Sequence, residues 1–262
     1  MWTLSKITYL TVYLECYLNL LNSVKMEYVS ENSEILNQKV ADWLLAYSRE
    51  VLQKQTRFTI ALSGGSTPQK LYKLLAREPY RSQIEWGKWH IFWGDERFVP
   101  ITDNRNNAKM ALETLLNHVP IPTLQIHVFN TNLDPETAAA HYETLLHQYF
   151  NEQNSTFDLV LLGMGDDGHT LSLFPNTAVV NEEKSWVKAF YLEPQAMFRI
   201  TLTAPVVNKA ACVAFLITGE KKAEVLQQVR QGKYQPDLYP SQRIKPANGN
   251  LIWFLDEAAK LV

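Results

Sequence analysis

The pattern of hydrophobic and polar positions predicts alternating helices and short buried strands from residue 26 onward. Residues 32–55 carry apolar side chains at three- and four-residue steps, which is the spacing of one helix face. Residues 157–162 show little alternation, as expected for a strand buried on both faces of a parallel sheet. We predict further strands at 57–62, 89–93, 124–129, 186–192, 198–202, 211–218 and 251–255, and further helices at 68–76, 106–117, 135–150, 221–230 and 256–261.

This order of elements predicts an α/β fold. Repeated strand–helix units favour a doubly wound, mostly parallel, Rossmann-like sheet with helices on both faces. We expect a polar loop after the strand at 89–93 and another loop before the last strand. Ligands of such sheets bind at the carboxyl ends of the strands, so candidate functional residues should directly follow the strands.

The first residues do not match this pattern. Residues 7–21 are strongly apolar, but they are fewer than the about 20 residues that a membrane-spanning helix needs. A signal peptide fits poorly, because no small-residue cleavage site follows. Three interpretations remain: an upstream extension before a translation start at Met26, a loosely packed helix, or a targeting segment. We favour the first and expect residues 1–25 as an extension and 26–262 as a single domain.

Composition and charge exclude several classes of protein. The chain has 262 residues, of which 46% are hydrophobic, as in ordinary globular proteins. The net charge of −2 gives no electrostatic footprint for nucleic acid or an anionic membrane. Two distant cysteines, Cys16 and Cys212, exclude a disulfide scaffold and suit a cytoplasmic location. No HExxH or similar pair calls for a metal.

The first cluster of candidate chemistry follows the strand at 57–62. Residues 63–68 read SGGSTP, in which the two glycines allow close backbone approach and positive φ angles. Thr67 can cap the next helix, and Pro68 suits its first position. Free N–H groups at a helix start stabilise an anion. The segment is therefore either a phosphate-binding loop or a plain strand–turn–helix junction.

The second cluster, residues 95–97, follows the strand at 89–93 and reads Asp-Glu-Arg. Charges at the end of a buried strand are costly unless they pair or meet a ligand. Asp95 can accept hydrogen bonds from sugar hydroxyls, and Arg97 can hold a phosphate or a carboxylate. The alternative is an ion pair that holds the loop, and for Glu96 both interpretations stay open.

The third cluster, residues 163–170, follows the strand at 157–162 and reads GMGDDGHT. Imidazole titrates near neutral pH and is the usual general base, and a neighbouring carboxylate can orient it. A single histidine is more often structural, but the position of His169 in a Gly/Asp loop after a buried strand favours catalysis. The chain has no GxSxG motif, which disfavours a serine nucleophile.

Together the three clusters resemble the 6-phosphogluconolactonases of the glucosamine/galactosamine-6-phosphate isomerase superfamily. The segments that carry the resemblance are SGGSTPQKLY, WGDERFVP and FDLVLLGMGDDGHTLSLFP, extended by FRITLT, TGEKKAEVL and WFLDEAA. They occur in the family's order and cover essentially residues 26–262, which also supports a start at Met26. The resemblance implies the glucosamine-6-phosphate deaminase-like form of the fold.

The resemblance also implies an activity and its residues. The reaction is hydrolysis of 6-phospho-D-glucono-1,5-lactone to 6-phospho-D-gluconate, the second step of the oxidative pentose phosphate pathway, without a metal or cofactor. His169 is the implied catalytic base, and Asp167 orients it or contacts the substrate. The implied substrate-binding residues are Gly64, Gly65, Ser66, Thr67, Asp95, Arg97, Arg199 and Lys222. Arg199 and Lys222 are implied phosphate ligands. The expected partner is the small-molecule substrate alone, bound by a monomer or weak homo-oligomer.

Three positions depart from the family pattern. Leu171 replaces the usual Ala of GHTASLFP, Asn176 replaces a Gly, and Asn106 replaces the Ser of a DSN motif. None of these changes removes a charged or catalytic group, but the change at Asn106 leaves the roles of Asn106 and Asn107 open.

Two other functions are weighed on the same residues. Glucosamine-6-phosphate deaminases read DEY and GxDGHIAFNEP where this chain has DER and GDDGHTLSLFP. Non-enzymatic sugar-phosphate sensors usually carry a DNA-binding region and often lose the catalytic histidine, whereas this chain retains His169. Both alternatives are disfavoured.

Overall fold

The computed structural model describes residues 26–151, 153–247 and 249–260, so the expectations for residues 1–25 lie outside its description. Within these ranges, six parallel strands form the main sheet in the order β1-β9-β8-β5-β2-β3. They are β1 (Met26–Ser30), β2 (Phe58–Leu62), β3 (Trp89–Trp93), β5 (Leu159–Leu162), β8 (Cys212–Ile217) and β9 (Asn250–Asp256).

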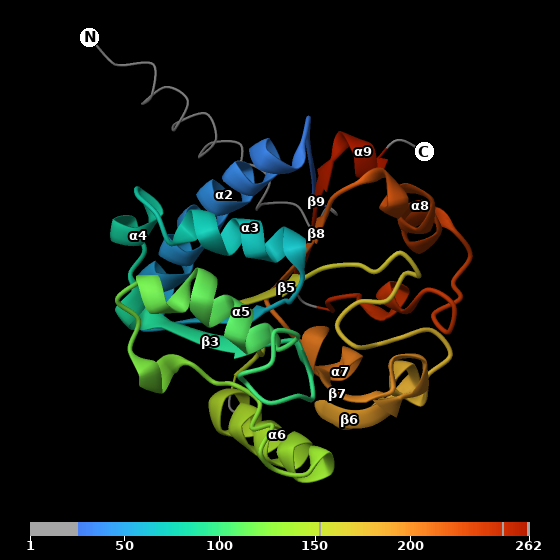
Figure 1. Cartoon of the computed structure of the whole chain (residues 1–262). Helices are drawn as coiled ribbons and strands as arrows, with labels where there is room; N and C mark the ends of the chain where they lie inside the picture. Colours follow the sequence, from blue (N-terminus) through green and yellow to red (C-terminus); the bar gives the residue numbers. More distant parts are fainter. Residues whose placement is uncertain (1–25, 152, 248, 261–262) are drawn as a thin grey trace.

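Helices flank this sheet on two sides (Figure 1). α2 (Ser33–Lys54) and α3 (Ser66–Leu75) lie on one side, and α8 (Ala223–Gln231) and α9 (Glu257–Lys260) on the other. The prediction of a doubly wound, mostly parallel sheet with helices on both faces is confirmed. Every residue of β2, β5 and β8 is buried, which explains why these segments read as nearly continuous apolar runs.

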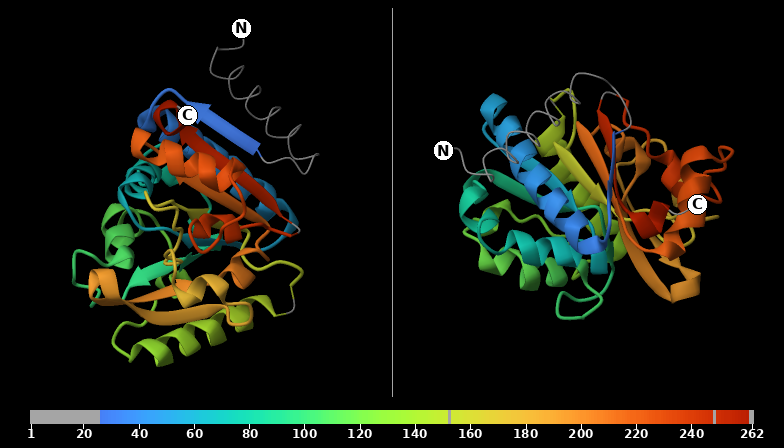
Figure 2. Two further views of the ribbon diagram at one scale, coloured as in Figure 1. Left: turned by 90° about the vertical axis from the view of Figure 1, so that its right-hand side faces the viewer. Right: turned by 90° about the horizontal axis from the view of Figure 1, so that it is seen from above.

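A second, antiparallel sheet has the order β4-β7-β6. Its strands are β4 (Asp95–Arg97), β6 (Val187–Leu192) and β7 (Met197–Leu202), and α6 (Pro135–Phe150) packs against it (Figure 2). The expectation of a polar loop after β3 is therefore wrong for residues 95–97. Their hydrogen-bonding partner, β7, lies about a hundred positions further along the chain, so no local sequence pattern predicts this pairing.

Smaller elements complete the fold. The short helices are α4 (Tyr80–Gln83), α5 (Asn107–Thr114) and α7 (Ala204–Val207). The 3₁₀ turns are η1 (Trp86–Lys88), η2 (Leu116–His118), η3 (Thr123–Gln125), η4 (Ala178–Asn181), η5 (Glu193–Gln195), η6 (Glu220–Lys222) and η7 (Pro240–Arg243). The predicted strand at 124–129 is wrong: Leu124 is 92% exposed, and a single bridge joins Ile126 to Ile91.

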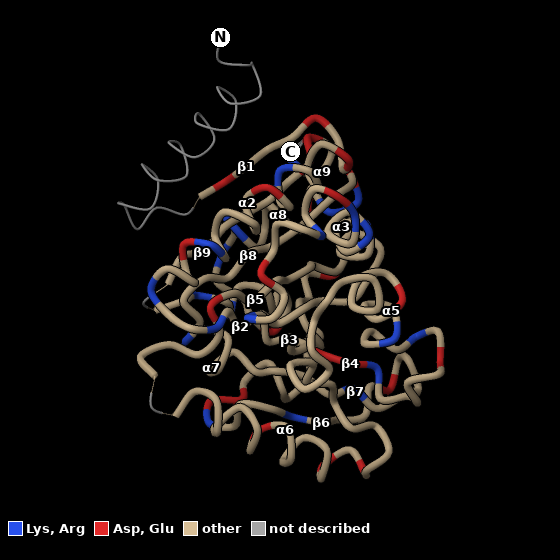
Figure 3. Tube along the Cα trace, turned by 90° about the vertical axis from the view of Figure 1, so that its left-hand side faces the viewer, with Lys and Arg blue, Asp and Glu red and all other residues tan. Residues whose placement is uncertain are grey.

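The described residues show neither a charged segment of one sign (Figure 3) nor a helix able to span a membrane. Lys and Arg positions are interspersed with Asp and Glu positions along the trace (Figure 3). In the ranges that the structure covers, no helix is both long enough and apolar enough to pass through a membrane.

The strand order creates a switch point in the main sheet. From β2 the chain steps to β3 on one side, and later returns to β5 on the other side of β2. Loops leaving neighbouring strands in opposite directions open a crevice at their carboxyl ends, where open α/β sheets bind ligands. The three sequence clusters follow β2, β3 and β5, so the topology brings them to one place.

Candidate active site

A cavity of about 350 Å³ lies at the carboxyl ends of β2, β3, β5 and β8. Of the predicted site residues, the following line it: Gly64, Gly65, Ser66, Thr67, Asp95, Arg97, His169, Arg199 and Lys222. Asp167 does not line the cavity but contacts His169. A larger groove of about 1000 Å³ beside α3, α4 and η2 contains none of the predicted residues.

His169 and Asp167 form a pair within one tight loop. The Nδ1 atom of His169 lies 2.5 Å from Oδ1 of Asp167, which also accepts the backbone N–H of His169 at 3.1 Å. An ionised carboxylate only accepts hydrogen bonds, so Nδ1 carries a proton, and in the neutral form of the ring the lone pair lies on Nε2. Burial raises the pKa of Asp167, but the hydrogen bond and charge of His169 outweigh it, and the net pKa is lowered.

The backbone of this loop leaves room for the pair. The carbonyl of His169 accepts the N–H of Gly165 at 2.8 Å, and Gly168 has a φ of 80°, which favours glycine. A Cβ atom on Gly165 would lie 2.1 Å from Nδ1 of His169 and 2.5 Å from Oδ1 of Asp167. The ring of Phe174 packs against the imidazole with centroids 4.2 Å apart. The glycine and the aromatic ring together hold the imidazole in one orientation.

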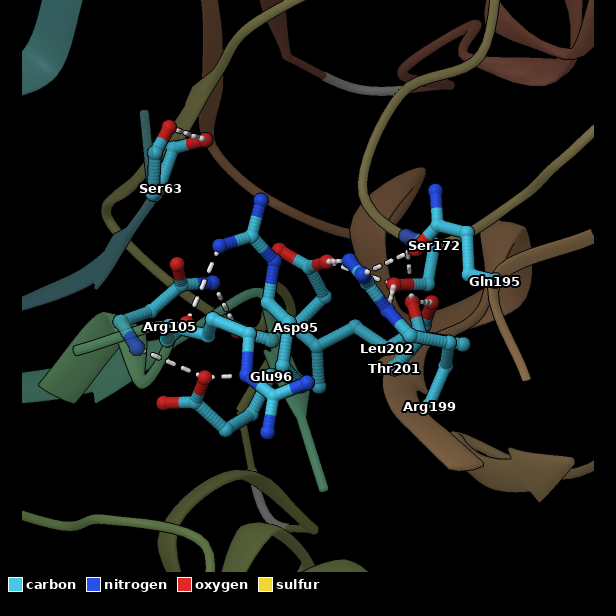
Figure 4. A network of polar contacts seen from close by, with 12 residues as sticks. Ser63, Asp95, Glu96, Arg105, Ser172, Gln195, Arg199, Thr201 and Leu202 are labelled. Atoms are coloured by element: carbon cyan, nitrogen blue, oxygen red, sulfur yellow. Dashed lines mark hydrogen bonds and ion pairs between the residues drawn. The ribbon is translucent and has the colours of Figure 1, made fainter. Parts of the chain in front are cut away.

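Asp95 and Arg199 form a buried ion pair beside the loop (Figure 4). Arg199 Nη2 lies 3.0 Å from Oδ2 of Asp95, and both side chains are under 10% exposed. Ser172 joins them, because its Oγ donates to Asp95 at 2.6 Å and accepts from Arg199 Nε at 3.0 Å. Ser172 is not among the residues predicted from the sequence, and its place in the SLFP segment, just after His169, is the one signal for it. Each charge therefore has a partner, and Arg199 still reaches the cavity wall.

The three residues of the DER segment, Asp95–Arg97, form β4 and so point their side chains to two different faces. Successive side chains of a strand point to opposite faces, so Asp95 and Arg97 line the cavity while Glu96 does not. The carboxylate of Glu96 accepts three backbone N–H groups, from Arg97, Asn107 and Ala108, at 2.7–2.9 Å. Glu96 thus binds the start of α5 rather than a ligand or a basic side chain. Burial raises its pKa to about 7, against the lowering effect of those donors.

The SGGSTP loop leads directly into α3. Gly65 is the N-cap, with a φ of 107°, and the helix begins at Ser66. The expectation that Thr67 caps this helix is therefore wrong, since Thr67 lies inside the first turn and its hydroxyl meets that of Thr218 at 3.0 Å. Gly64 is needed for packing, because its Cβ would lie 2.0 Å from Oδ1 of Asn107. The unpaired N–H groups of this helix start face a site suited to an anion.

Lys222 comes from η6, beyond the end of β8, and lines the cavity. Its ammonium lies 2.5 Å from Oδ1 of Asp166, the residue next to Asp167. The lysine side chain is 23% exposed and the carboxylate 63%. The cavity therefore has a cationic side built by Lys222 and the start of α3, and a basic imidazole on the β5 loop.

Two of the three departures from the family pattern, at Asn106 and Asn176, have local explanations. Asn106 is the N-cap of α5, where its Oδ1 accepts the N–H of Lys109 at 2.8 Å, a role that Ser also fills well. Asn107 is buried, lines the cavity and donates to the carbonyl of Asp95 at 3.1 Å. Asn176 has a φ of 59°, a left-handed conformation that Asn tolerates better than most residues. Nothing in the structure explains the exchange of Ala for Leu171.

Comparison with known proteins identifies the family. A family model described as "Glucosamine-6-phosphate isomerases/6-phosphogluconolactonase" matches residues 31–253, and the chain belongs to this family. A relative from Oryza sativa, "Probable 6-phosphogluconolactonase 3, chloroplastic", is 40% identical over 242 residues, covering 88% of this chain and 74% of the relative. The "6-phosphogluconolactonase" of Synechocystis is 38% identical, with 87% and 94% covered.

A solved structure agrees with these relatives. The 6-phosphogluconolactonase from Trypanosoma brucei matches with a TM-score of 0.79 and 26% sequence identity, covering 91% of this chain and 98% of that one. The fold is therefore shared over nearly the whole described chain.

Proposed function

We propose that this chain hydrolyses 6-phospho-D-glucono-1,5-lactone to 6-phospho-D-gluconate, the second step of the oxidative pentose phosphate pathway. One observation carries the proposal: a single cavity joins the His169–Asp167 pair to the helix start and Lys222. A lactone phosphorylated on its far end needs a base at one side of the site and anion binding at the other. Family membership and the named relatives support the same reaction.

The proposed chemistry needs no covalent intermediate, because a lactone is an activated ester. Nε2 of His169 takes a proton from a water molecule as the water oxygen bonds to C1. When the bond from C1 to the ring oxygen breaks, the imidazolium returns that proton to the leaving oxygen. Asp167 stabilises the imidazolium, as in serine-protease triads. A base placed in this way contributes about 10²–10⁴-fold to the rate.

Binding and charge stabilisation fall to the remaining residues. The N–H groups and hydroxyls of Gly64, Gly65, Ser66 and Thr67, with Lys222, bind the phosphate and so position the ring. Arg199 adds positive charge to the cavity wall while its ion pair with Asp95 keeps it in place. Arg97, or a loop N–H group, stabilises the oxyanion that develops on the carbonyl oxygen.

The test compares two substrates. Proton release from 6-phosphogluconolactone is measured and corrected for spontaneous opening, beside ammonia release from glucosamine 6-phosphate. Lactone turnover without ammonia release supports the proposal, and the reverse result would establish the deaminase alternative.

His169→Asn should abolish turnover while leaving the affinity for 6-phosphogluconate largely intact; near-normal turnover in this variant would overturn the proposed base.

The phosphate site has its own test. Lys222→Ala should weaken turnover of the phosphorylated lactone much more than that of glucono-1,5-lactone. Lys221→Ala is the matched control, because Lys221 is the adjacent exposed lysine and does not line the cavity. Equal effects of Lys222→Ala on both substrates would identify a structural lysine instead.

We further propose that residues 26–262 form one domain that works in the cytoplasm as a monomer or weak homo-oligomer. The small number of cysteines and the buried thiol of Cys212 support a reducing compartment. Light scattering of the purified chain tests the oligomeric state, and cell fractionation tests the location. The rice relatives are named as chloroplastic, and recovery of this chain in an organelle would contradict the cytoplasmic location.

A further inference from the structure

We propose that Asp166 competes with the substrate's phosphate for Lys222 and so limits how tightly phosphorylated ligands bind. This inference rests on the proposed function, because it assigns a specificity-determining role to a residue beside the same cavity. Asp166 is a neighbour of the binding residues, not a ligand of the substrate, since it does not line the cavity.

The two adjacent carboxylates of the β5 loop serve different partners. Asp167 lies 2.5 Å from the imidazole of His169, and Asp166 lies 2.5 Å from the ammonium of Lys222. Since neighbouring side chains of this loop point to different partners, the segment connects the proposed base with the proposed phosphate site. Among the described residues, Asp166 has no ion-pair partner other than Lys222.

The competition follows from charge. Lys222 reaches the cavity wall, so a phosphate at the start of α3 would meet its ammonium from the cavity side while Asp166 holds it from outside. Two anions on one ammonium repel each other, so the phosphate binds by weakening the existing pair. The pair is partly solvated, with Asp166 63% exposed, and exposed ion pairs are worth little. The carboxylate can therefore yield to the phosphate, but it lowers the phosphate affinity.

The experiment removes the charge and keeps the shape. In Asp166→Asn, the affinity for 6-phosphogluconate and for inorganic phosphate should rise by about two- to fivefold in titration calorimetry, the range expected for a partly exposed pair. KM for the phosphorylated lactone should fall by a similar factor, with kcat changed less. Turnover of glucono-1,5-lactone should stay unchanged, because it has no phosphate. Asp166→Glu keeps the charge and should leave the phosphate affinity and KM near their wild-type values.

A matched control removes an equal charge elsewhere. Glu183 is an exposed carboxylate that does not line the cavity, so Glu183→Gln should alter none of these quantities. Weaker or unchanged phosphate binding in Asp166→Asn would overturn the proposal, and weaker binding would show that Asp166 holds Lys222 ready for the phosphate.

Two further outcomes separate the causes. If Asp166→Asn changed the turnover of glucono-1,5-lactone by the same factor, the effect would lie on the Asp167–His169 pair, and the proposal would also be overturned. Failure of the proposed function would appear differently, as a wild-type protein that binds phosphate yet hydrolyses neither lactone.

Discussion

Gly165→Ala should inactivate the enzyme by displacing the imidazole that the proposed reaction needs. Gly165 does not have a positive φ, so the substitution tests space and not left-handed backbone strain. The added Cβ would lie 2.1 Å from Nδ1 and 2.3 Å from Cε1 of His169, and 2.5 Å from Oδ1 of Asp167. Non-bonded heavy atoms are comfortable at about 3.5–4.0 Å, so the ring must retreat by more than about 1 Å.

This displacement sets the size of the expected loss. A misplacement of about 1 Å at a catalytic group can cost about 10²-fold in rate. Loss of the whole contribution of the base would cost up to about 10⁴-fold, which gives the upper limit. Phosphate binding should change little, because Lys222 and the start of α3 lie outside the contact made by the new methyl group.

The assay is proton release from 6-phosphogluconolactone, corrected for spontaneous opening, together with the inhibition constant of 6-phosphogluconate. Gly87→Ala is the control, because a Cβ on Gly87 meets nothing within 4 Å. A cooperatively unfolding Gly165→Ala protein with turnover within about threefold of the wild type would refute the reasoning. An equally large loss of product affinity would show that the site collapsed rather than that the ring moved.

Gly64→Ala should lower the free energy of unfolding by about 1–3 kcal/mol relative to Gly87→Ala, because the added Cβ overlaps the buried Asn107. Urea unfolding measures this difference, and equal stabilities of the two variants would contradict it. Glu96 has its pKa raised to about 7 from an ordinary 4.5, so the native state binds this proton more tightly than the unfolded chain. The free energy of unfolding should therefore fall as pH rises from about 4.5 to about 7, and Glu96→Gln should remove that slope; parallel pH profiles would count against it. EDTA should leave the lactonase rate unchanged, because the part of the chain that the structure describes offers no group of three His, Cys, Asp or Glu side chains for a metal; a loss that Zn²⁺ restores would contradict this.

The main sheet was largely predictable from the local pattern. Fully buried strands such as β2, β5 and β8 read as apolar runs, and a long amphipathic helix such as α2 reads as a 3.6-residue period. Weak patterns misled: β1 was missed because four of its five residues are only half-buried at the sheet edge. The run at 124–129 has the composition of a short strand, but Leu124 faces solvent.

By itself, the sequence determined that the three clusters after β2, β3 and β5 meet at one cavity. Parallel strands end at one edge, so the residues that follow them meet there whatever the details of packing. Only the tertiary structure decided which partners those residues have. The pairing of β4 with β7, distant in the chain, places Asp95 against Arg199 and points Glu96 away toward α5. The partners, the burial and the direction of these side chains depend on segments that meet only when the chain is folded.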